Sequence, residues 1–297
     1  MNRLLITGAT GFLGVPCVLR ATTEFEVHPV ARRCGPLALL VPSHACDLFD
    51  RGAVTRLFAS VRPTHLLHLA WIATPGVYWT APDNHRWVEA SKQLLTTFAE
   101  YGGRRAVVAG TCAEYDWAAE GFCNEFTTPT RPGTVYGRCK NELREWCERC
   151  GASVAWARLF FLYGPREHPA RLVPSVARAL LAGEVAECSA GTQERDFLHV
   201  DDVADALISL VKGDVTGPVN VGSGEAVAVR TVVEAVARWC GRPDLVRLGA
   251  RPTPPTEPPR LVADVSRLRD ELGWRPSIPF EDGIGDAVLY WRARRAA

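Results

Sequence analysis

Two side chains have types and spacing that suit proton transfer: Tyr136 and Lys140. Tyr136 and Lys140 form a YxxxK pattern, and residues four apart on a helix share one face. The Lys140 ammonium can then lie near the Tyr136 phenol and favour its ionised form. A phenol with an ordinary pKa of ~10 transfers protons too slowly at neutral pH, so such a neighbour is useful. We expect these two residues to take part in catalysis.

A glycine pattern near the start of the chain suits a dinucleotide. It reads GxxGxxG, follows an apolar run and precedes a helical stretch. Glycines allow the tight turn and the close approach of backbone to pyrophosphate, and the helix N-terminus supplies amide donors and a partial positive charge. The cofactor residues predicted here are Gly8, Thr10, Gly11, Phe12, Leu13 and Gly14.

The end of the second predicted strand bears on the choice of dinucleotide. An acidic residue there would hold the ribose of NAD, whereas arginine suits the 2′-phosphate of NADP. The chain has Arg32 and Arg33 at this place, and Glu24 and Glu26 come too early. We therefore expect NADP(H) to be preferred over NAD(H), the alternative being that both arginines are simply solvated.

Further motifs appear in the order of a known family. They are Cys46-Asp47-Leu48, His68-Leu69-Ala70, Thr111-Cys112-Ala113-Glu114-Tyr115, Tyr136 with Lys140, Arg158 to Pro165, Arg195 to Asp202, Asn220 to Gly224, and Ala263-Asp264 with Leu272-Gly273-Trp274. With these motifs the chain resembles the extended short-chain dehydrogenase/reductase family, in its nucleotide-sugar epimerase/dehydratase/reductase group. The second motif resembles the family's HLAA stretch.

The resemblance implies a role for each matching residue. Thr111 would hydrogen-bond the reacting sugar oxygen, Tyr136 would exchange its proton, and Lys140 would lower the tyrosine pKa and hold the nicotinamide ribose. Arg195 would pair with the substrate diphosphate; Arg171 is a second candidate or a surface ion-pair partner. Further cofactor residues are Asp47, Leu48, Leu69, Ala70, Trp71 and Phe160, and the substrate set is Thr111, Cys112, Glu114, Phe161, Arg171, Val173 and Arg195.

Departures from the family pattern narrow the reaction. Dehydratases carry Asp and Glu where this chain has Cys112 and Ala113. Phe161 replaces an asparagine common in epimerases, and Arg251 is out of register with a diphosphate arginine. The expectation is NADPH-dependent reduction of a nucleotide-linked keto sugar, a 4-keto-6-deoxyhexose. The alternatives are an NAD(P)-dependent nucleotide-sugar epimerase and a non-catalytic NADP-binding regulator.

Composition limits the other classes of function. The chain has 297 residues and a formal net charge of +1, which is unlike a nucleic-acid or anionic-membrane binder. No apolar window approaches the ~18 residues of a membrane span, and the N-terminus does not resemble a signal peptide. A cytoplasmic protein is expected. The CxxC at Cys147 and Cys150 lacks partners for zinc, so no metal is expected.

These residues need a scaffold, and alternating apolar and amphipathic stretches predict it. Strands are expected at 3–7, 25–30, 65–70, 106–109 and 153–159, with helices at 12–22, 50–61, 84–101 and 136–150. The fold class is α/β: a Rossmann-type doubly wound parallel sheet with a smaller, discontinuous C-terminal α/β substrate lobe. Residues 1–160 and 196–223 are assigned to the nucleotide domain, and 161–195 and 224–297 to the lobe. The resemblance implies a homodimer formed through the two helices expected at 84–101 and 136–150.

Overall fold

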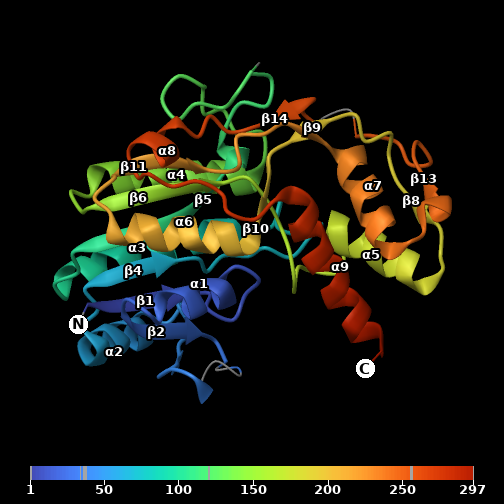
Figure 1. The fold of residues 1–297 in the computed structure, drawn as a ribbon. Helices are drawn as coiled ribbons and strands as arrows, with labels where there is room; N and C mark the ends of the chain where they lie inside the picture. Colours follow the sequence, from blue (N-terminus) through green and yellow to red (C-terminus); the bar gives the residue numbers. More distant parts are fainter. Residues whose placement is uncertain (1, 34, 36–38, 120, 255–256, 297) are drawn as a thin grey trace.

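A parallel sheet of seven strands forms the centre of the molecule (Figure 1). The structure, a computed structural model, describes residues 2–33, 35, 39–119, 121–254 and 257–296. In spatial order the strands are β11 (Gly217–Val221), β6 (Val154–Leu159), β5 (Arg105–Thr111), β4 (His65–His68), β1 (Arg3–Thr7), β2 (Glu26–Ala31) and β3 (His44–Ala45). The direction of winding reverses between β1 and β4, which opens a crevice at the carboxyl ends of the strands. The predicted fold class is confirmed.

Helices cover both faces of this sheet. One face carries α1 (Gly14–Ala21) and α6 (Val200–Lys212), and the other carries α2 (Arg51–Val61), α3 (Asp83–Glu100) and α4 (Val135–Arg149). Side chains alternate between the faces along a strand, so Leu4 and Ile6 of β1 join the first core and Leu5 joins the second. Of the helices described, none has the length and apolarity needed to cross a membrane.

The predicted elements differ from the observed ones mainly at their ends. The strand expected at 106–109 continues to Thr111, so Thr111 is the last residue of β5. The first helix starts at Gly14 rather than at Phe12, because residues 8 to 13 are used by the glycine turn. Thr134 accepts a hydrogen bond from the Gly137 amide and so caps α4, which carries Tyr136 in its first turn.

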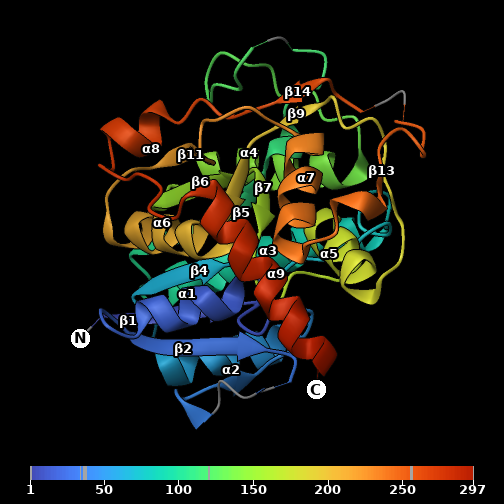
Figure 2. The same cartoon turned by 45° about the vertical axis from the view of Figure 1, so that its right-hand side comes forward.

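A second core lies beside the carboxyl ends of the sheet (Figure 2). It is built from α5 (Leu172–Ala182), α7 (Val229–Cys240) and α9 (Phe280–Ala296). Short strands surround it: β7 (Phe161–Tyr163) pairs with β10 (Phe197–His199), β8 (Ala186–Glu187) with β13 (Val246–Arg247), and β9 (Glu194–Arg195) with β12 (Val227–Ala228) and β14 (Arg260–Leu261). The short helices η2 (Cys112–Glu114), η3 (Pro243–Leu245) and α8 (Ser266–Asp270) complete the described elements.

The chain crosses between the two cores several times. Pro218 to Val221 returns to the sheet as β11, as expected, whereas β10 pairs outside it and α6 covers its face. Leu268 and Trp274 also pack into the core on the α1 side of the sheet, although they fall in the predicted lobe. The exact division into domains stays a prediction.

The carboxylate of Asp196 joins three of these crossing segments. It is fully buried and accepts hydrogen bonds from the Ser223 amide and hydroxyl at 2.6 and 2.8 Å, the Gly224 amide at 2.9 Å and the Ala263 amide at 3.1 Å. Buried amides without a partner are costly, so this one carboxylate satisfies groups that no strand ladder reaches.

We predict that Asp196→Ala lowers the free energy of unfolding by about 2–4 kcal/mol, since it leaves buried donors unpaired. Urea denaturation followed by circular dichroism measures this. The matched control is Glu225→Ala in the same segment, whose side chain is exposed, with a change within about 0.5 kcal/mol. Equal stabilities of the two variants would contradict the role given to Asp196.

Candidate functional site

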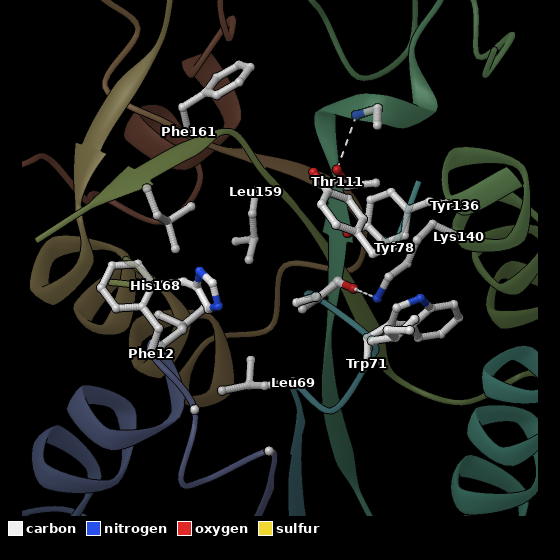
Figure 3. Close-up of a pocket in the computed structure, with 18 of the residues that line it drawn as sticks. Phe12, Leu69, Trp71, Tyr78, Thr111, Tyr136, Lys140, Leu159, Phe161 and His168 are labelled. Atoms are coloured by element: carbon white, nitrogen blue, oxygen red, sulfur yellow. Dashed lines mark hydrogen bonds between the residues drawn. The ribbon is translucent and has the colours of Figure 1, made fainter. Parts of the chain in front are cut away.

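A cavity of about 940 Å³ opens at the carboxyl ends of the central strands. It runs from the glycine turn, past Thr111, Tyr136 and Lys140, to Arg195 in the second lobe. Figure 3 shows the middle of this cavity, with Phe12 and Leu69 on one side of Leu159 and the Tyr136 and Lys140 side chains on the other. Its size and position, at the reversal of strand order, suit an extended ligand with a dinucleotide at one end.

The glycine turn leaves room for a ligand because side chains are excluded there. Gly8 has φ +69°, and a Cβ on it would lie 2.9 Å from the Ala70 amide nitrogen. A Cβ on Gly14 would lie 2.1 Å from the Gly8 carbonyl oxygen. Among the described residues no side chain caps the start of α1, but the Val15 amide donates to the Gly11 carbonyl at 3.2 Å and Pro16 has no amide hydrogen. The amides that can face an anion are therefore those of the turn just before the helix. This cradle fits the pyrophosphate of a dinucleotide.

The residues after β2 divide between cavity and solvent. Arg32 and Arg33 are both exposed; Arg32 lines the cavity and Arg33 does not. Asp47 and Leu48 line the cavity on the next segment, and Asp47 Oδ1 accepts a hydrogen bond from the Phe49 amide at 3.0 Å. Of the two arginines assigned to the cofactor, Arg32 is thus the one that faces the cavity, and contact of either with a dinucleotide stays a prediction.

Thr111, Tyr136 and Lys140 lie together in the cavity wall (Figure 3). Thr111 ends β5, and its hydroxyl oxygen accepts a hydrogen bond from the Ala113 amide at 3.2 Å. Lys140 follows Tyr136 by one turn of α4, and its ammonium donates to the Ala109 carbonyl at 2.7 Å. The expected grouping of the three side chains is thus present.

The pKa of Tyr136 is raised above its ordinary value. Burial of the phenol is the largest cause and outweighs the lowering by a hydrogen bond with Thr111. The sequence-based expectation of a lowered pKa is therefore wrong for the protein without ligand. Tyr136 is protonated at neutral pH, which suits it to donate a proton.

The pKa of Lys140 is shifted in the opposite direction, below its ordinary value. Burial lowers its pKa to about 7, and the field of Glu114 partly offsets this. His68, whose ring bonds the Thr7 hydroxyl at 2.7 Å and the Ser91 hydroxyl at 2.8 Å, has its pKa lowered to about 3 by burial and by Lys140. His68 is therefore a neutral structural residue, and Lys140 is half charged near neutrality.

Glu114, assigned to the substrate, does not line the cavity and is fully buried behind it. Its carboxylate accepts from the Thr111 amide at 2.8 Å, the Trp156 indole at 2.9 Å and the Arg158 guanidinium at 2.8 Å. These bonds use the carboxylate within the protein, so the assignment to substrate is corrected. Glu114 instead fixes the segment that carries Thr111.

Arg195 lies in the cavity wall but has a partner that the sequence did not reveal. It is 3% exposed, and its Nη2 donates to Glu257 Oε1 at 2.9 Å. Glu257 also lines the cavity. An incoming diphosphate would have to compete with this carboxylate for Arg195.

Arg171 also lines the cavity and has a carboxyl neighbour. Its guanidinium lies 5.3 Å from the centre of the Tyr78 ring. Glu167, in the same wall, is buried, its Oε2 has no hydrogen-bond partner among the described residues, and burial raises its pKa to about 8 despite Arg171. Glu167 and His168 come two and three residues after Pro165, the end of a matching motif, and that position is the signal that could have pointed to them.

Most of the predicted site residues line the cavity. The exceptions are Arg33, Glu114 and Val173, and Val173 instead packs into the second core. Four aromatics, Trp71, Tyr78, Trp79 and Trp117, also line it. Trp87, which the sequence did not single out, joins them. Sequence reasoning identified the strand ends well and missed residues that face the cavity from loops.

Taken together, the fold and site define a Rossmann enzyme that uses a nicotinamide dinucleotide. Residues 4–222 match the model of the NAD dependent epimerase/dehydratase family, and the chain belongs to that family.

Curated relatives cover nearly the whole chain. A dTDP-glucose 4,6-dehydratase of Xanthomonas campestris is 29% identical, over 98% of this chain and 93% of the relative. A UDP-glucose 4-epimerase of Azospirillum brasilense is 28% identical, over 97% and 91% respectively. Among solved structures, the Thermus thermophilus UDP-glucose 4-epimerase in complex with NAD superposes with a TM-score of 0.86 at 29% identity, covering 98% of this chain and 99% of the other.

The buried ion pair behind Thr111 gives a stability prediction. Glu114→Gln should lower the free energy of unfolding by about 3–5 kcal/mol, because Arg158 would remain buried without a counter-charge. The control is Glu281→Gln, which breaks an exposed pair with Arg238 and should cost at most about 1 kcal/mol. Chemical denaturation of both variants makes the comparison. A loss for Glu114→Gln no larger than the control's would show that the pair does not hold this wall.

Proposed function

We propose that this protein is an NADPH-dependent reductase of a nucleotide-linked keto sugar, a 4-keto-6-deoxyhexose. The observation that carries the proposal is the buried phenol of Tyr136 beside Thr111 and Lys140 in a cavity continuous with a dinucleotide cradle, where burial raises the pKa of the phenol. Reduction of a ketone needs a proton donor at the carbonyl oxygen, and a buried phenol with a raised pKa holds that proton at neutral pH.

The proposed reaction is a simple transfer. The dinucleotide, when bound, supplies a hydride to the carbonyl carbon of the sugar. Thr111 hydrogen-bonds the carbonyl oxygen, and Tyr136 donates its phenolic proton to that oxygen as negative charge develops. The ammonium of Lys140 stabilises the phenolate that forms and holds the nicotinamide ribose. The products would be the sugar alcohol and NADP⁺, and the one proton consumed would be taken up from solvent to reprotonate Tyr136.

Two features favour reduction over the reactions of the named relatives. Cys112 and Ala113 occupy the wall next to Thr111, and burial raises the pKa of the Cys112 thiol, so neither side chain supplies the acid and base that expel water. Phe161 lines the cavity where the epimerase pattern has asparagine. Arg32, with no carboxylate at the end of β2, supports NADPH as the reductant.

The second candidate is a nucleotide-sugar epimerase. The relatives that support it are the UDP-glucose 4-epimerases, one of them solved with NAD. An epimerase oxidises and re-reduces its sugar, so it turns over without added NADPH and keeps its cofactor during purification. Homodimerisation through α3 and α4, which pack side by side, belongs to the same set of proposals.

Reductase activity is tested with NADPH and a panel of nucleotide-linked 4-keto-6-deoxy sugars, followed by loss of absorbance of the reduced cofactor. We predict turnover that falls about 10²–10⁴-fold in Tyr136→Phe, because the proton donor is removed. Tyr101→Phe, at the end of α3 and away from the cavity, should keep full activity. Turnover of a nucleotide sugar without added NADPH, with none of the keto sugars reduced, would select the epimerase.

Cofactor choice gives a separate prediction. Arg32→Ala should raise the Kd for NADPH about 10- to 100-fold, since it removes a charge-assisted contact to the 2′-phosphate, and should change the Kd for NADH little. Arg33→Ala is the matched control, because Arg33 does not line the cavity, and it should leave both values unchanged. Quenching of tryptophan fluorescence measures both. A wild-type protein that binds NADH more tightly than NADPH would refute the preference.

A further inference from the structure

The ammonium of Lys140 lies in the protein interior with few partners. The residue is 3% exposed, and its Nζ donates to the Ala109 carbonyl at 2.7 Å. The same Nζ lies 3.8 Å from the centre of the Trp71 ring, over its face. Figure 3 shows the indole directly beside the end of the lysine side chain. In the part of the chain that the structure describes, no carboxylate is within ion-pair distance of this ammonium.

Other titratable groups face Lys140, but they add little negative charge. His68 of β4 is neutral, Cys147 of α4 stays a thiol because burial raises its pKa, and Tyr136 stays a phenol. Glu114 of η2 is the remaining source of negative charge among the groups whose fields Lys140 feels. Its carboxylate is already bonded to Arg158 at 2.8 Å. The buried ammonium therefore needs stabilisation from another kind of group.

The Trp71 ring is held in place for this contact. Its Nε1 donates to the buried Asn84 Oδ1 at 2.8 Å, and the Asn84 amide nitrogen donates to the Tyr78 and Ala81 carbonyls, both at 2.8 Å. Trp87 stacks beside it, with ring centres 6.1 Å apart. The indole is thus fixed by a fully used amide and by a second aromatic ring. Trp71 stands where the HLAA pattern has its second alanine.

A cation over the face of tryptophan is attracted by the ring quadrupole, most strongly when both groups are shielded from water. We propose that Trp71 is a positioning residue for Lys140: its indole face keeps the buried ammonium charged and directs it to the side of the cavity where Tyr136 lies. The inference rests on the proposed function in one respect: that the reaction uses the positive charge of Lys140. Without the indole, burial alone would favour the neutral amine.

The test measures the charge on Lys140 directly. The chain contains three lysines, Lys92, Lys140 and Lys212, so carbon-13 labelling of the lysine side chains gives three NMR signals to titrate. The signal of Lys140 is assigned by its loss in Lys140→Arg. Lys92 and Lys212 are internal references that should titrate alike in every variant.

The informative pair of variants is Trp71→Phe and Trp71→Leu. Both lose the bond to Asn84 and are similar in size, but only phenylalanine keeps an aromatic face. We expect the Lys140 midpoint, about 7 in the wild type, to fall by roughly one pH unit in Trp71→Leu and much less in Trp71→Phe. Trp71→Met replaces the leucine variant if that one does not fold. Equal midpoints in the aromatic and aliphatic variants would overturn the proposal.

This readout uses neither sugar nor cofactor, so it separates the two proposals. If no keto sugar is reduced but the midpoints differ as expected, the role of Trp71 stands and the proposed function fails. If the reductase is active but the midpoints agree, the reverse holds. In an active enzyme, the alkaline limb of kcat/KM should move to lower pH in Trp71→Leu relative to Trp71→Phe, because the amine loses its charge earlier.

Discussion

The buried carboxylate of Glu114 is the interaction on which the site depends. It joins the end of β5 to the middle of β6 through Thr111, Trp156 and Arg158. Arg158 then bonds the Tyr115 hydroxyl, which donates to Asn220 on β11. Three neighbouring strands are thereby fixed at the edge where the cavity opens. The hydrogen-bonded ion pair of Glu114 and Arg158 restricts Thr111 more than packing alone would, because removal of either partner leaves an unpaired charge in the core.

Ionisation in this site is governed by burial more than by charge pairs. Burial raises the pKa of Tyr136 and lowers that of Lys140, and both shifts favour the neutral form of each group. A proton on the phenol is therefore retained until a ligand changes the surroundings. Of the nearby arginines, Arg195 is paired with Glu257, whereas Glu167, whose pKa burial raises to about 8, offsets little of the charge of Arg171.

The sequence allowed the framework to be predicted because its signals are local. Glycines at a strand-helix junction, a YxxxK in the first turns of a helix and the apolar strands depend on residues a few positions apart, and these predictions agree with the structure. Glu257 meets Arg195 across 62 positions, and Glu114 meets Arg158 across 44. Such pairings follow from tertiary packing, which no local pattern encodes. The prediction of where a side chain points fails for the same reason. Arg33 and Val173 are next in sequence to cavity residues but do not line the cavity themselves.

The position of β11 at the edge of the sheet bears on how the chain is made. β11 pairs with β6, yet the ribosome must complete α5, β10 and α6 between them. Until residue 221 has emerged, the outer edge of β6 lacks its partner and Asn220 cannot reach Tyr115. The nascent chain thus carries an open strand edge while the residues between Leu159 and Gly217 are made, and an open edge is prone to aggregation and to chaperone binding. For this reason the nucleotide domain and the lobe are expected to complete their folding together.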